Sequence, residues 1–360
     1  MSANSTRLRN EALINIGLIG AGNISDTHAR AATAIPGVAI AAVQAPTLEH
    51  AQRLAARHGA VAYDTLDGLL AHRPLEMVAI GSPSGLHADQ GIAAARQRLH
   101  VLVEKPIDVT TARTDALIAE AARAGVTLGV IFQDRLKPDV QRLKALVAGG
   151  RLGSPILATA AVKWYRAPSY YRDSRWRGTR SLDGGGALIN QGVHTVDLLL
   201  WLFGPVRRVY AKAAAKLHQI EVEDTAVAVL EFENGALGTL EAATSAFPGY
   251  SRRIELTGSN GTVILDGDRL AAVDLQDATE AEKAGPAEAG HYVPSASAAT
   301  VSAASPIVAD ASAHQRVFED FLRAVEQRTA PCCDGHGGRA SVALIEAVYL
   351  SARTDRPVEL

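Results

Sequence analysis

Residues 14–25 read INIGLIGAGNIS, an apolar run that ends in a glycine turn. The run has the length and composition of a buried parallel strand. Gly20 permits a tight turn, and Gly22 lets the backbone approach a pyrophosphate at the start of a helix that we predict over about 23–35. A strand, a glycine turn and a helix in this order predict a dinucleotide site that includes Gly20, Gly22, Asn23 and Ile24.

The same motif departs from the full dinucleotide fingerprint at two points. Its third position is Ser25 rather than glycine, and no carboxylate follows the second predicted strand, 39–43, where an acid would bind the ribose. Gln44 or Thr47 could hydrogen-bond a ribose hydroxyl there, and the nearest arginine is Arg53, inside the next predicted helix. The sequence therefore predicts NAD or NADP as the cofactor, with a slight preference for NAD.

Strands and helices alternate over the first part of the chain. Strands alternating with helices predict a parallel sheet covered on both faces, so the fold class is α/β, with a doubly wound Rossmann domain at residues 1–135. The further runs of this pattern are strands at 77–80, 101–103 and 127–131 and helices at 47–57, 87–96 and 111–124.

The pattern changes beyond Gly153, where strands follow one another with tight turns. Asn234-Gly235 is a strong hairpin signal, because both positions tolerate positive φ. We predict an α+β domain at residues 136–360 with an open, mostly antiparallel sheet, one helix over 186–203, a surface loop at 277–305 and two closing helices that could pack back on the first domain. Its strands are expected at 156–163, 206–213, 225–233, 236–243, 252–257 and 262–265.

Composition narrows the class of protein. The chain has 360 residues, 48% of them hydrophobic, and a net charge of −2, so it lacks the basic excess that a nucleic-acid partner requires. No run reaches the roughly 18 apolar residues that span a bilayer, and residues 1–11 do not resemble a signal peptide, so we expect a cytoplasmic protein with no membrane partner. Cys332 and Cys333 are adjacent, and no His, Cys or carboxylate cluster has ligand spacing, so we predict no metal.

Taken in order, the motifs resemble the glucose–fructose oxidoreductase / inositol dehydrogenase family (Gfo/Idh/MocA) over nearly the whole chain. The resemblance implies hydride transfer between NAD(P) and a sugar, polyol or related carbinol. It also implies a homodimer or homotetramer formed through the C-terminal sheet. The motifs are GAGNI at 20–24, SPSGLH at 82–87, EKP at 104–106, LDGGGALINQGVH at 182–194, DG at 334–335 and GRA at 338–340.

The first candidate catalytic residue is Lys105. It follows the predicted strand 101–103, which places it at the carboxyl edge of the sheet, where ligands bind. The resemblance implies that Lys105 hydrogen-bonds the reacting hydroxyl, and an ammonium suits this task because it stabilises a developing alkoxide. The alternative is a solvated lysine paired with Glu104.

A second candidate group lies on the predicted helix 186–203. Asn190, His194 and Asp197 follow the spacing i, i+4 and i+7, which places them on one helix stripe. The resemblance implies that His194 is a general acid/base, for which an ordinary pKa of about 6.5 suits it. Asn190 stands where the family commonly has aspartate, so it could orient the substrate but not act as a base. Asp197 is expected to hold the imidazole or to cap the fold.

The remaining cofactor-side candidates come from the resemblance. They are Ser82, Pro83, His87 and Glu104, together with Gln44 and Lys105. His87 has an equally good alternative as the start of a helix.

Aromatic and basic residues crowd the segment before the catalytic helix. Aromatic faces suit sugar rings and arginine forks suit carboxylates or phosphates, so we predict a carbohydrate substrate contacted by Tyr165, Arg166, Trp176 and Arg177. A loop packed at a domain or subunit interface is the plainer alternative.

Within the family, the segment most resembles the branch that oxidises sugar or sugar-nucleotide hydroxyls, such as the 3-dehydrogenases. Competing functions are an inositol or polyol dehydrogenase, a non-catalytic dinucleotide-binding regulator, and an NAD-dependent glycosidase or dehalogenating enzyme.

Overall fold

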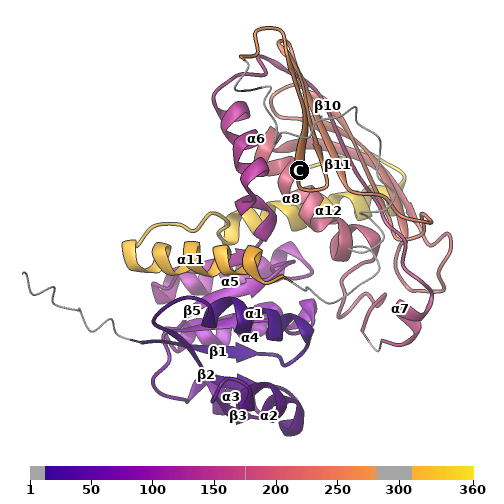
Figure 1. Ribbon diagram of the computed structural model, residues 1–360. Coiled ribbons are helices and arrows are strands. Elements are labelled where there is room, and N and C mark those ends of the chain that lie inside the picture. Colours follow the sequence, from indigo (N-terminus) through magenta and orange to yellow (C-terminus); the bar gives the residue numbers. More distant parts are fainter. Residues whose placement is uncertain (1–12, 175, 280–281, 283–309) are drawn as a thin grey trace, which may run out of the picture.

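The computed structural model describes residues 13–174, 176–279, 282 and 310–360. Two sheets dominate it, the first built by the N-terminal part of the chain and the second by the later part (Figure 1). The opening motif folds as expected into strand β1 (Ile14–Ile19) and helix α1 (Asn23–Thr33), with the glycine turn between them. Residues 1–11 and most of the expected loop at 277–305 lie outside the described residues.

The first sheet has six parallel strands in the order β3-β2-β1-β4-β5-β6, which confirms the Rossmann fold. The chain leaves β1 toward one edge and returns to β4 on its other side. The carboxyl ends of β1 and β4 therefore border the crevice where ligands bind in such sheets. The other strands are β2 (Val38–Gln44), β3 (Val61–Tyr63), β4 (Met77–Ile80), β5 (His100–Glu104) and β6 (Leu128–Ile131).

Helices connect these strands. The sequence pattern did not predict β3 or α3, because both are short and too brief to show a period. The connecting helices are α2 (Leu48–Ala56), α3 (Leu66–Leu70), α4 (His87–Arg96) and α5 (Thr111–Ala124), with the short turns η1 (Ser84–Leu86) and η2 (Gln133–Leu136) at the sheet edge.

The second sheet has eight strands in the order β13-β12-β11-β7-β10-β9-β8-β14. Every neighbouring pair is antiparallel except β7 and β10. The Asn234-Gly235 hairpin is confirmed between β9 and β10, where Gly235 has φ +88°. The strands are β7 (Pro155–Lys163), β8 (Val206–Ala214), β9 (Thr225–Phe232), β10 (Leu237–Ala243), β11 (Arg253–Gly258), β12 (Gly261–Asp266), β13 (Arg269–Leu275) and β14 (Val358–Glu359).

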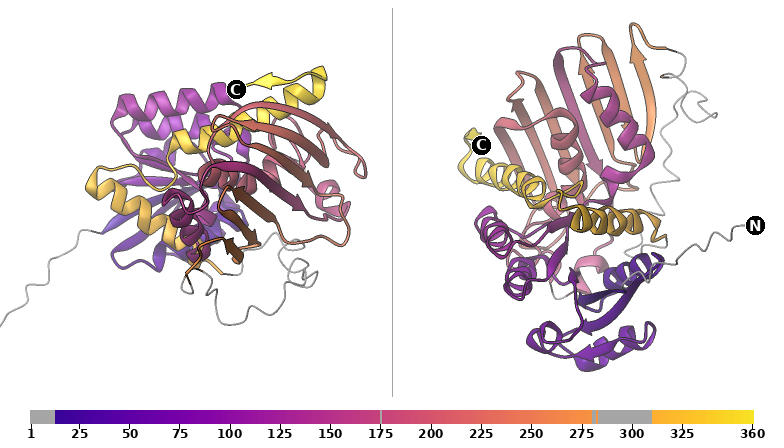
Figure 2. Two further views of the ribbon diagram at one scale, coloured as in Figure 1. Left: turned by 90° about the horizontal axis from the view of Figure 1, so that it is seen from above. Right: turned by 90° about the vertical axis from the view of Figure 1, so that its left-hand side faces the viewer.

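Helices cover one face of this sheet and leave the other open (Figure 2). Along β9, buried residues alternate with exposed ones, as a sheet with one solvated face requires. The covering helices are α6 (Pro138–Ala148), α8 (Val193–Phe203) and α12 (Gly335–Thr354). Among the described residues, no helix is both long and apolar enough to cross a membrane.

The predicted continuous helix over 186–203 is wrong in its first part. Residues Ala187–Gly192 form a π-helical turn, η3, and the α-helix α8 begins only at Val193. The carboxylate of Glu223 accepts hydrogen bonds from the amides of Gly186 (3.0 Å) and Leu188 (2.8 Å), which pins the start of the helix to a neighbouring segment. A π turn is wider than an α turn and is often found at functional sites.

The last helices join the two sheets. Helix α11 (Ser312–Gln327) packs against α1, and its Phe318 and Phe321 are buried in one core with Ile16 and Leu18 of β1 (Figure 1). Helix α12 packs on β8 and α8 and also contacts α5. The end of the chain therefore fixes the second sheet against the first.

Candidate active site

The glycine turn leaves the start of α1 open. Gly20 has φ +102°, and a Cβ at this position would lie 2.8 Å from the carbonyl oxygen of Gly81, so the turn requires glycine. A Cβ at Gly22 would meet nothing within 4 Å, and no side chain caps the helix. Open amides at a helix N-terminus form an anion site, so these residues fit the pyrophosphate of a dinucleotide.

Ser25 in the third position does not disturb the packing of α1 on the sheet. A Cβ at Gly81, just after β4, would lie 2.8 Å from the Ser25 hydroxyl oxygen. The third glycine of the fingerprint serves close helix–strand packing. In this protein the close contact is possible because Gly81, which follows the strand, has no side chain.

At the end of β2, Gln44 is buried. Its backbone carbonyl accepts the amide of Gly20 at 2.8 Å, and its side-chain amide lies 3.4 Å from the carbonyl of Asp64. The nearby Arg53 pairs with Glu49 at 3.1 Å. The one arginine that the sequence offered for a 2′-phosphate therefore already has a carboxylate partner.

His87 ties two segments of the sheet edge together. Its ring nitrogens lie 2.8 Å from the carbonyl of Pro106 and 2.9 Å from that of Ser82, and burial lowers the pKa of the imidazole. The Ser82 hydroxyl donates to Gln90 at 2.6 Å, and Pro83 precedes η1. His87 therefore holds the Ser82–Pro83 segment against the EKP segment.

Lys105 leaves the end of β5 and reaches the second part of the chain. Its ammonium donates to the carbonyl of Asn190 at 3.0 Å, and the residue is partly buried. Burial lowers the pKa of Lys105, while the charges of Glu104 and Asp183 oppose that effect. Lys105 is thus a directed, desolvated cation at the carboxyl edge of the sheet rather than a solvated surface lysine.

His194 lies in the first turn of α8. Its ring packs edge-to-face on Phe132, with centroids 5.6 Å apart. Burial lowers the pKa of His194 to about 3; Asp134 opposes this shift, and Lys105 adds to it. The imidazole is therefore neutral near pH 7, which is the form that a general base requires, and it is weakly basic in this environment.

Asp197 does not hold this imidazole. Its carboxylate accepts two hydrogen bonds from the Arg135 guanidinium, at 2.7 and 2.8 Å, and both side chains are buried. The carboxylate closest to His194 belongs to Asp134, whose oxygen lies 3.6 Å from Nδ1, too far for a hydrogen bond. Asp197 therefore holds α8 against η2. Of the three residues predicted to share one helix stripe, it is not part of the candidate site.

Asn190 lies in a network that the sequence did not reveal. Its side-chain amide donates to the buried carboxylate of Asp183, and its side-chain oxygen accepts from Gln191 at 2.7 Å. Burial raises the pKa of Asp183 to about 6, although the amides of Gly178 and Asn190 donate to it. The negative charge missing at Asn190 is thus present one side chain away, at Asp183.

Arg166 and Arg177 pack against the same ring. Their guanidinium carbons lie 5.1 Å and 4.3 Å from the centroid of Tyr170. Arg166 also donates to Gln191 at 2.7 Å, and Arg177 lies 5.4 Å from the Trp176 ring. Within the described part of the chain, no carboxylate forms an ion pair with either arginine, and neither Nε has a partner.

Tyr165 stands apart from this group, because its ring packs on Phe247 at 5.2 Å. The structure thus joins four of the five predicted substrate residues, Asn190, Arg166, Trp176 and Arg177, and adds Tyr170, Asp183 and Gln191. These three residues lie in a segment that contains many other polar and aromatic side chains. Their spacing in the sequence therefore could not distinguish them as site residues.

The two parts of the chain meet beside these residues. The amide of Gly85 in η1 donates to the carbonyl of Leu182 at 3.1 Å, and a Cβ at Gly85 would lie 2.3 Å from the carbonyl of Ser181. The segment before η3 therefore crosses directly onto the edge of the first sheet, which brings Lys105 and Asn190 into contact.

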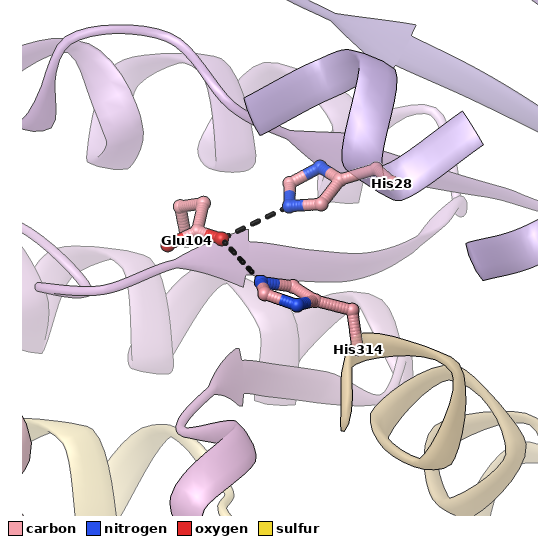
Figure 3. A group of neighbouring side chains, drawn as sticks. All are labelled: His28, Glu104 and His314. Atoms are coloured by element: carbon pink, nitrogen blue, oxygen red, sulfur yellow. Dashed lines mark hydrogen bonds and ion pairs between the residues drawn. The ribbon is translucent and has the colours of Figure 1, made fainter. Parts of the chain in front are cut away.

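Glu104 turns its carboxylate to a different set of residues. It lies 2.9 Å from Nε2 of His28 and 3.7 Å from Nε2 of His314, and all three side chains are buried (Figure 3). These residue types are common metal ligands, and their ligand atoms lie within 4.8 Å of one another. The sequence could not indicate this cluster, because its members come from α1, β5 and α11.

A Rossmann sheet with an open glycine turn, a directed lysine and a neutral histidine defines a nicotinamide-dependent oxidoreductase. Comparison with protein families agrees. Residues 14–132 match the oxidoreductase family with an NAD-binding Rossmann fold, and residues 140–264 match the GFO/IDH/MocA C-terminal domain. The chain belongs to the Gfo/Idh/MocA family.

Several characterised relatives are sugar dehydrogenases. The chain is 27% identical to D-glucoside 3-dehydrogenase of Escherichia coli, covering 96% of this chain and 97% of the relative. It is 28% identical to myo-inositol 2-dehydrogenase of Thermotoga maritima, over 73% and 78%. The crystal structure of the WlbA dehydrogenase from Bordetella pertussis with NADH and UDP-GlcNAcA superposes with a TM-score of 0.86 at 30% identity, covering 97% and 98%.

Proposed function

We propose that this protein is an NAD-dependent dehydrogenase that oxidises a secondary hydroxyl of an anionic sugar, either a sugar acid or a sugar nucleotide. The observation that carries the proposal is the placement of Lys105 and neutral His194 beside the crevice edge that holds the open glycine turn. The proposed catalytic residues are these two.

The reaction divides between the two side chains. Lys105 donates a hydrogen bond to the reacting oxygen and stabilises the negative charge that develops on it. His194 accepts the hydroxyl proton as the carbinol becomes a carbonyl, and later releases that proton to solvent. The bound nicotinamide supplies the hydride acceptor. Asn190 and Asp183 direct the ammonium, because the Asn190 carbonyl accepts one of its hydrogens and Asp183 holds the Asn190 side chain.

The arginine pair supports an anionic substrate. Arg166 is buried and Arg177 is half-buried against Tyr170, and among the described residues neither forms an ion pair with a carboxylate. Burying an unpaired cation is costly, so a substrate carboxylate or phosphate would complete this site. Trp176 offers a ring face to the sugar. The WlbA complex, whose ligand UDP-GlcNAcA is a sugar nucleotide, supports the same class.

NAD is the proposed cofactor, held by Gly20, Gly22, Asn23, Ile24 and Gln44, with Ser82 and Pro83 on the nicotinamide side. Arg53 forms an exposed ion pair with Glu49, and we propose that it stays in this pair rather than binding a 2′-phosphate. His87 and Glu104 act indirectly, by positioning the segments around the nicotinamide. A ratio of kcat/KM for NAD over NADP below one would contradict this assignment.

The division of labour follows the sequence prediction: residues 1–135 bind the dinucleotide, and residues 136–360 bind substrate and form the assembly. We propose a cytoplasmic homodimer or homotetramer that associates through the open face of the second sheet. That face exposes Leu157, Val227, Val229 and Leu237.

The proposal is tested by assaying sugar acids, sugar nucleotides, neutral sugars and inositols with NAD and NADP, following formation of the reduced nicotinamide. We expect turnover of an anionic sugar, and its loss in Lys105→Ala and His194→Ala. Full turnover by both variants would contradict the catalytic roles of Lys105 and His194, and cofactor binding with no turnover of any compound would contradict the enzyme assignment. Preference for a neutral inositol would replace the substrate class and favour a polyol dehydrogenase.

The arginine pair provides the control within the site. Arg177→Ala should raise KM for the anionic substrate and change kcat little, because the guanidinium binds the substrate away from the reacting carbon. Arg172→Ala, which removes an exposed arginine of the same segment paired with Asp173, should leave KM unchanged.

A further inference from the structure

The buried cluster of His28, Glu104 and His314 joins three distant parts of the chain. His28 comes from α1, Glu104 from the end of β5 and His314 from α11, and both imidazoles point at the carboxylate (Figure 3). Helix α1 begins at the dinucleotide turn, and Glu104 directly precedes Lys105. A group that touches the cofactor helix, the catalytic segment and α11 is well placed to influence the active site.

Hydrogen bonding explains this cluster better than metal binding. A carboxylate only accepts, so the Nε2 atom of His28, 2.9 Å from Glu104, carries the hydrogen. The Nδ1 atoms of His28 and His314 have no hydrogen-bond partner among the described residues. Metal-bound histidines almost always donate their second ring nitrogen to a partner, which this arrangement does not provide.

The carboxylate is the charged member of the cluster. Burial by itself would raise the pKa of Glu104, but the hydrogen bond from His28 and the nearby imidazole of His314 hold it well below its usual range. Burial lowers the pKa of His28 despite the neighbouring Glu104, so this imidazole is neutral. Glu104 also accepts the backbone amide of Lys105 at 3.0 Å, and a carboxylate with several N–H donors stays ionised even when buried.

This charge acts directly on Lys105. Burial lowers the pKa of the ammonium, and Glu104 is the strongest charge that opposes the shift. The other charged groups near Lys105 are Asp183, Asp134 and Arg166, with His194 neutral beside them. Among the two aspartates, Asp134 is already engaged by Arg252 and Lys137. Glu104 is therefore the main countercharge that belongs to the same segment as Lys105.

We propose that Glu104 is a positioning residue for Lys105: its buried negative charge, held by His28 and His314, keeps the neighbouring ammonium charged and in place. The inference rests on the role of Lys105 proposed above. It extends that role to residues of α1 and α11 that touch neither substrate nor cofactor.

The test measures the ionisation of Lys105 directly, without turnover. In protein carrying ¹³Cε-labelled lysine, the Lys105 signal is assigned with Lys105→Met and followed through a pH titration. We expect Glu104→Gln to lower the Lys105 pKa by about 1–3 units, which is the effect of removing a close opposite charge. Glu49→Gln, an exposed carboxylate on α2, should leave the titration unchanged.

The histidines separate a charge effect from a loss of packing. His28→Leu removes the N–H donor and should lower the Lys105 pKa, because Glu104 is then less firmly ionised, whereas His28→Gln keeps an N–H donor and should restore it. NADH binding and near-ultraviolet circular dichroism verify that each variant is folded. An unchanged Lys105 titration in folded Glu104→Gln would overturn the proposal, as would a stoichiometric metal in the purified protein.

A second readout distinguishes this proposal from the proposed function. If a sugar is oxidised, the alkaline limb of kcat against pH should move in Glu104→Gln by the same amount as the Lys105 titration. If no sugar is oxidised but the Lys105 titration moves as expected, the proposed activity fails and the positioning role of Glu104 stands. A moved titration with an unmoved alkaline limb would overturn the role in catalysis.

Discussion

The ammonium of Lys105 donates to the backbone carbonyl of Asn190 at 3.0 Å, across 85 residues of sequence. Lys105 directly follows β5, the last strand but one of the first sheet, and Asn190 lies in the π turn that precedes α8. An ammonium has three N–H donors, so this bond directs the other two. Lys105, the proposed catalytic lysine, is thus directed by the later part of the chain, so residues from both parts form the candidate site.

Replacing Lys105 tests this arrangement. In Lys105→Met, kcat should fall by about 10²–10³ or more, because the variant loses the donor that stabilises the developing alkoxide. The dissociation constant for NADH, measured by fluorescence titration, should change little. Lys163→Met, which removes an exposed lysine of β7, should match the wild type in both measurements.

The two glycines of the dinucleotide turn should respond differently to alanine. Gly20→Ala should lower the free energy of unfolding by about 1–3 kcal/mol, because φ is +102° and the new Cβ meets the Gly81 carbonyl. Gly22→Ala should leave the unfolding free energy within about 0.5 kcal/mol, because its Cβ would meet no protein atom, but should weaken NADH binding. Urea unfolding and NADH titration measure the two effects. Equal losses of stability would contradict this distinction.

The raised pKa of Asp183 predicts that the activity depends on pH. The ionised carboxylate holds the Asn190 amide and faces Lys105, so activity should fall as the pH drops through about 6, the pKa to which burial raises this group. Asp183→Asn should remove that acidic limb of kcat/KM. His194 has a pKa of about 3, so its own ionisation lies well below this limb. An acidic limb that persists near pH 6 in Asp183→Asn would assign it to another group.

Ionisation of Asp183 should favour activity but lower the stability of the fold. A pKa of about 6 in the folded state is above the ordinary 3.8, so the contribution of Asp183 to stability is full below pH 3.8 and is lost as the pH rises through 6. Between pH 5 and pH 7 the loss should be about 1 kcal/mol. The difference between wild type and Asp183→Asn in urea unfolding at the two pH values measures it.

How much of the fold and of the candidate site could be predicted from the sequence depends on how far apart in the sequence the interacting residues lie. The turn at Gly20 and Gly22 is local, since a strand, its glycines and the following helix are contiguous, and it was predicted correctly. The π turn depends on Glu223, which caps amides 35 to 37 residues earlier in the chain. No local period could reveal that contact, so the helix was predicted to begin too early.

The same limit applies to the site. Asp197 was expected to hold the His194 imidazole or to cap the fold; its partner is Arg135, 62 residues away, so the first of these alternatives is wrong. The cluster around Glu104 needs α11, which is far away in sequence. Motif resemblance located Lys105 and His194, but only the fold shows which charged groups surround them.

The buried pair of Asp197 and Arg135 gives a prediction about stability alone. Asp197→Asn should lower the free energy of unfolding by about 3–5 kcal/mol, because the Arg135 charge stays buried without its partner. The kcat of the folded fraction should remain near that of the wild type, since the carboxylate contacts neither His194 nor Lys105. A large loss of kcat with unchanged stability would instead indicate that Asp197 acts on the imidazole.

We predict that copies of the chain associate through the open face of the second sheet. Leu237 pairs with Leu157 across β10 and β7, and Val229 pairs with Tyr210 across β9 and β8, so exposed apolar side chains are adjacent on a face that no helix covers. Exposed apolar pairs on an uncovered sheet face support the interface proposed above. Val229→Glu combined with Leu237→Glu should yield a monomer in analytical ultracentrifugation.

Val61→Glu, at an exposed position on the edge strand β3 of the first sheet, should keep the oligomer. Because Lys105 and His194 are held by contacts within one chain, the monomer should still bind NADH. If the double variant keeps the mass of the wild-type assembly, the interface lies elsewhere on the molecule.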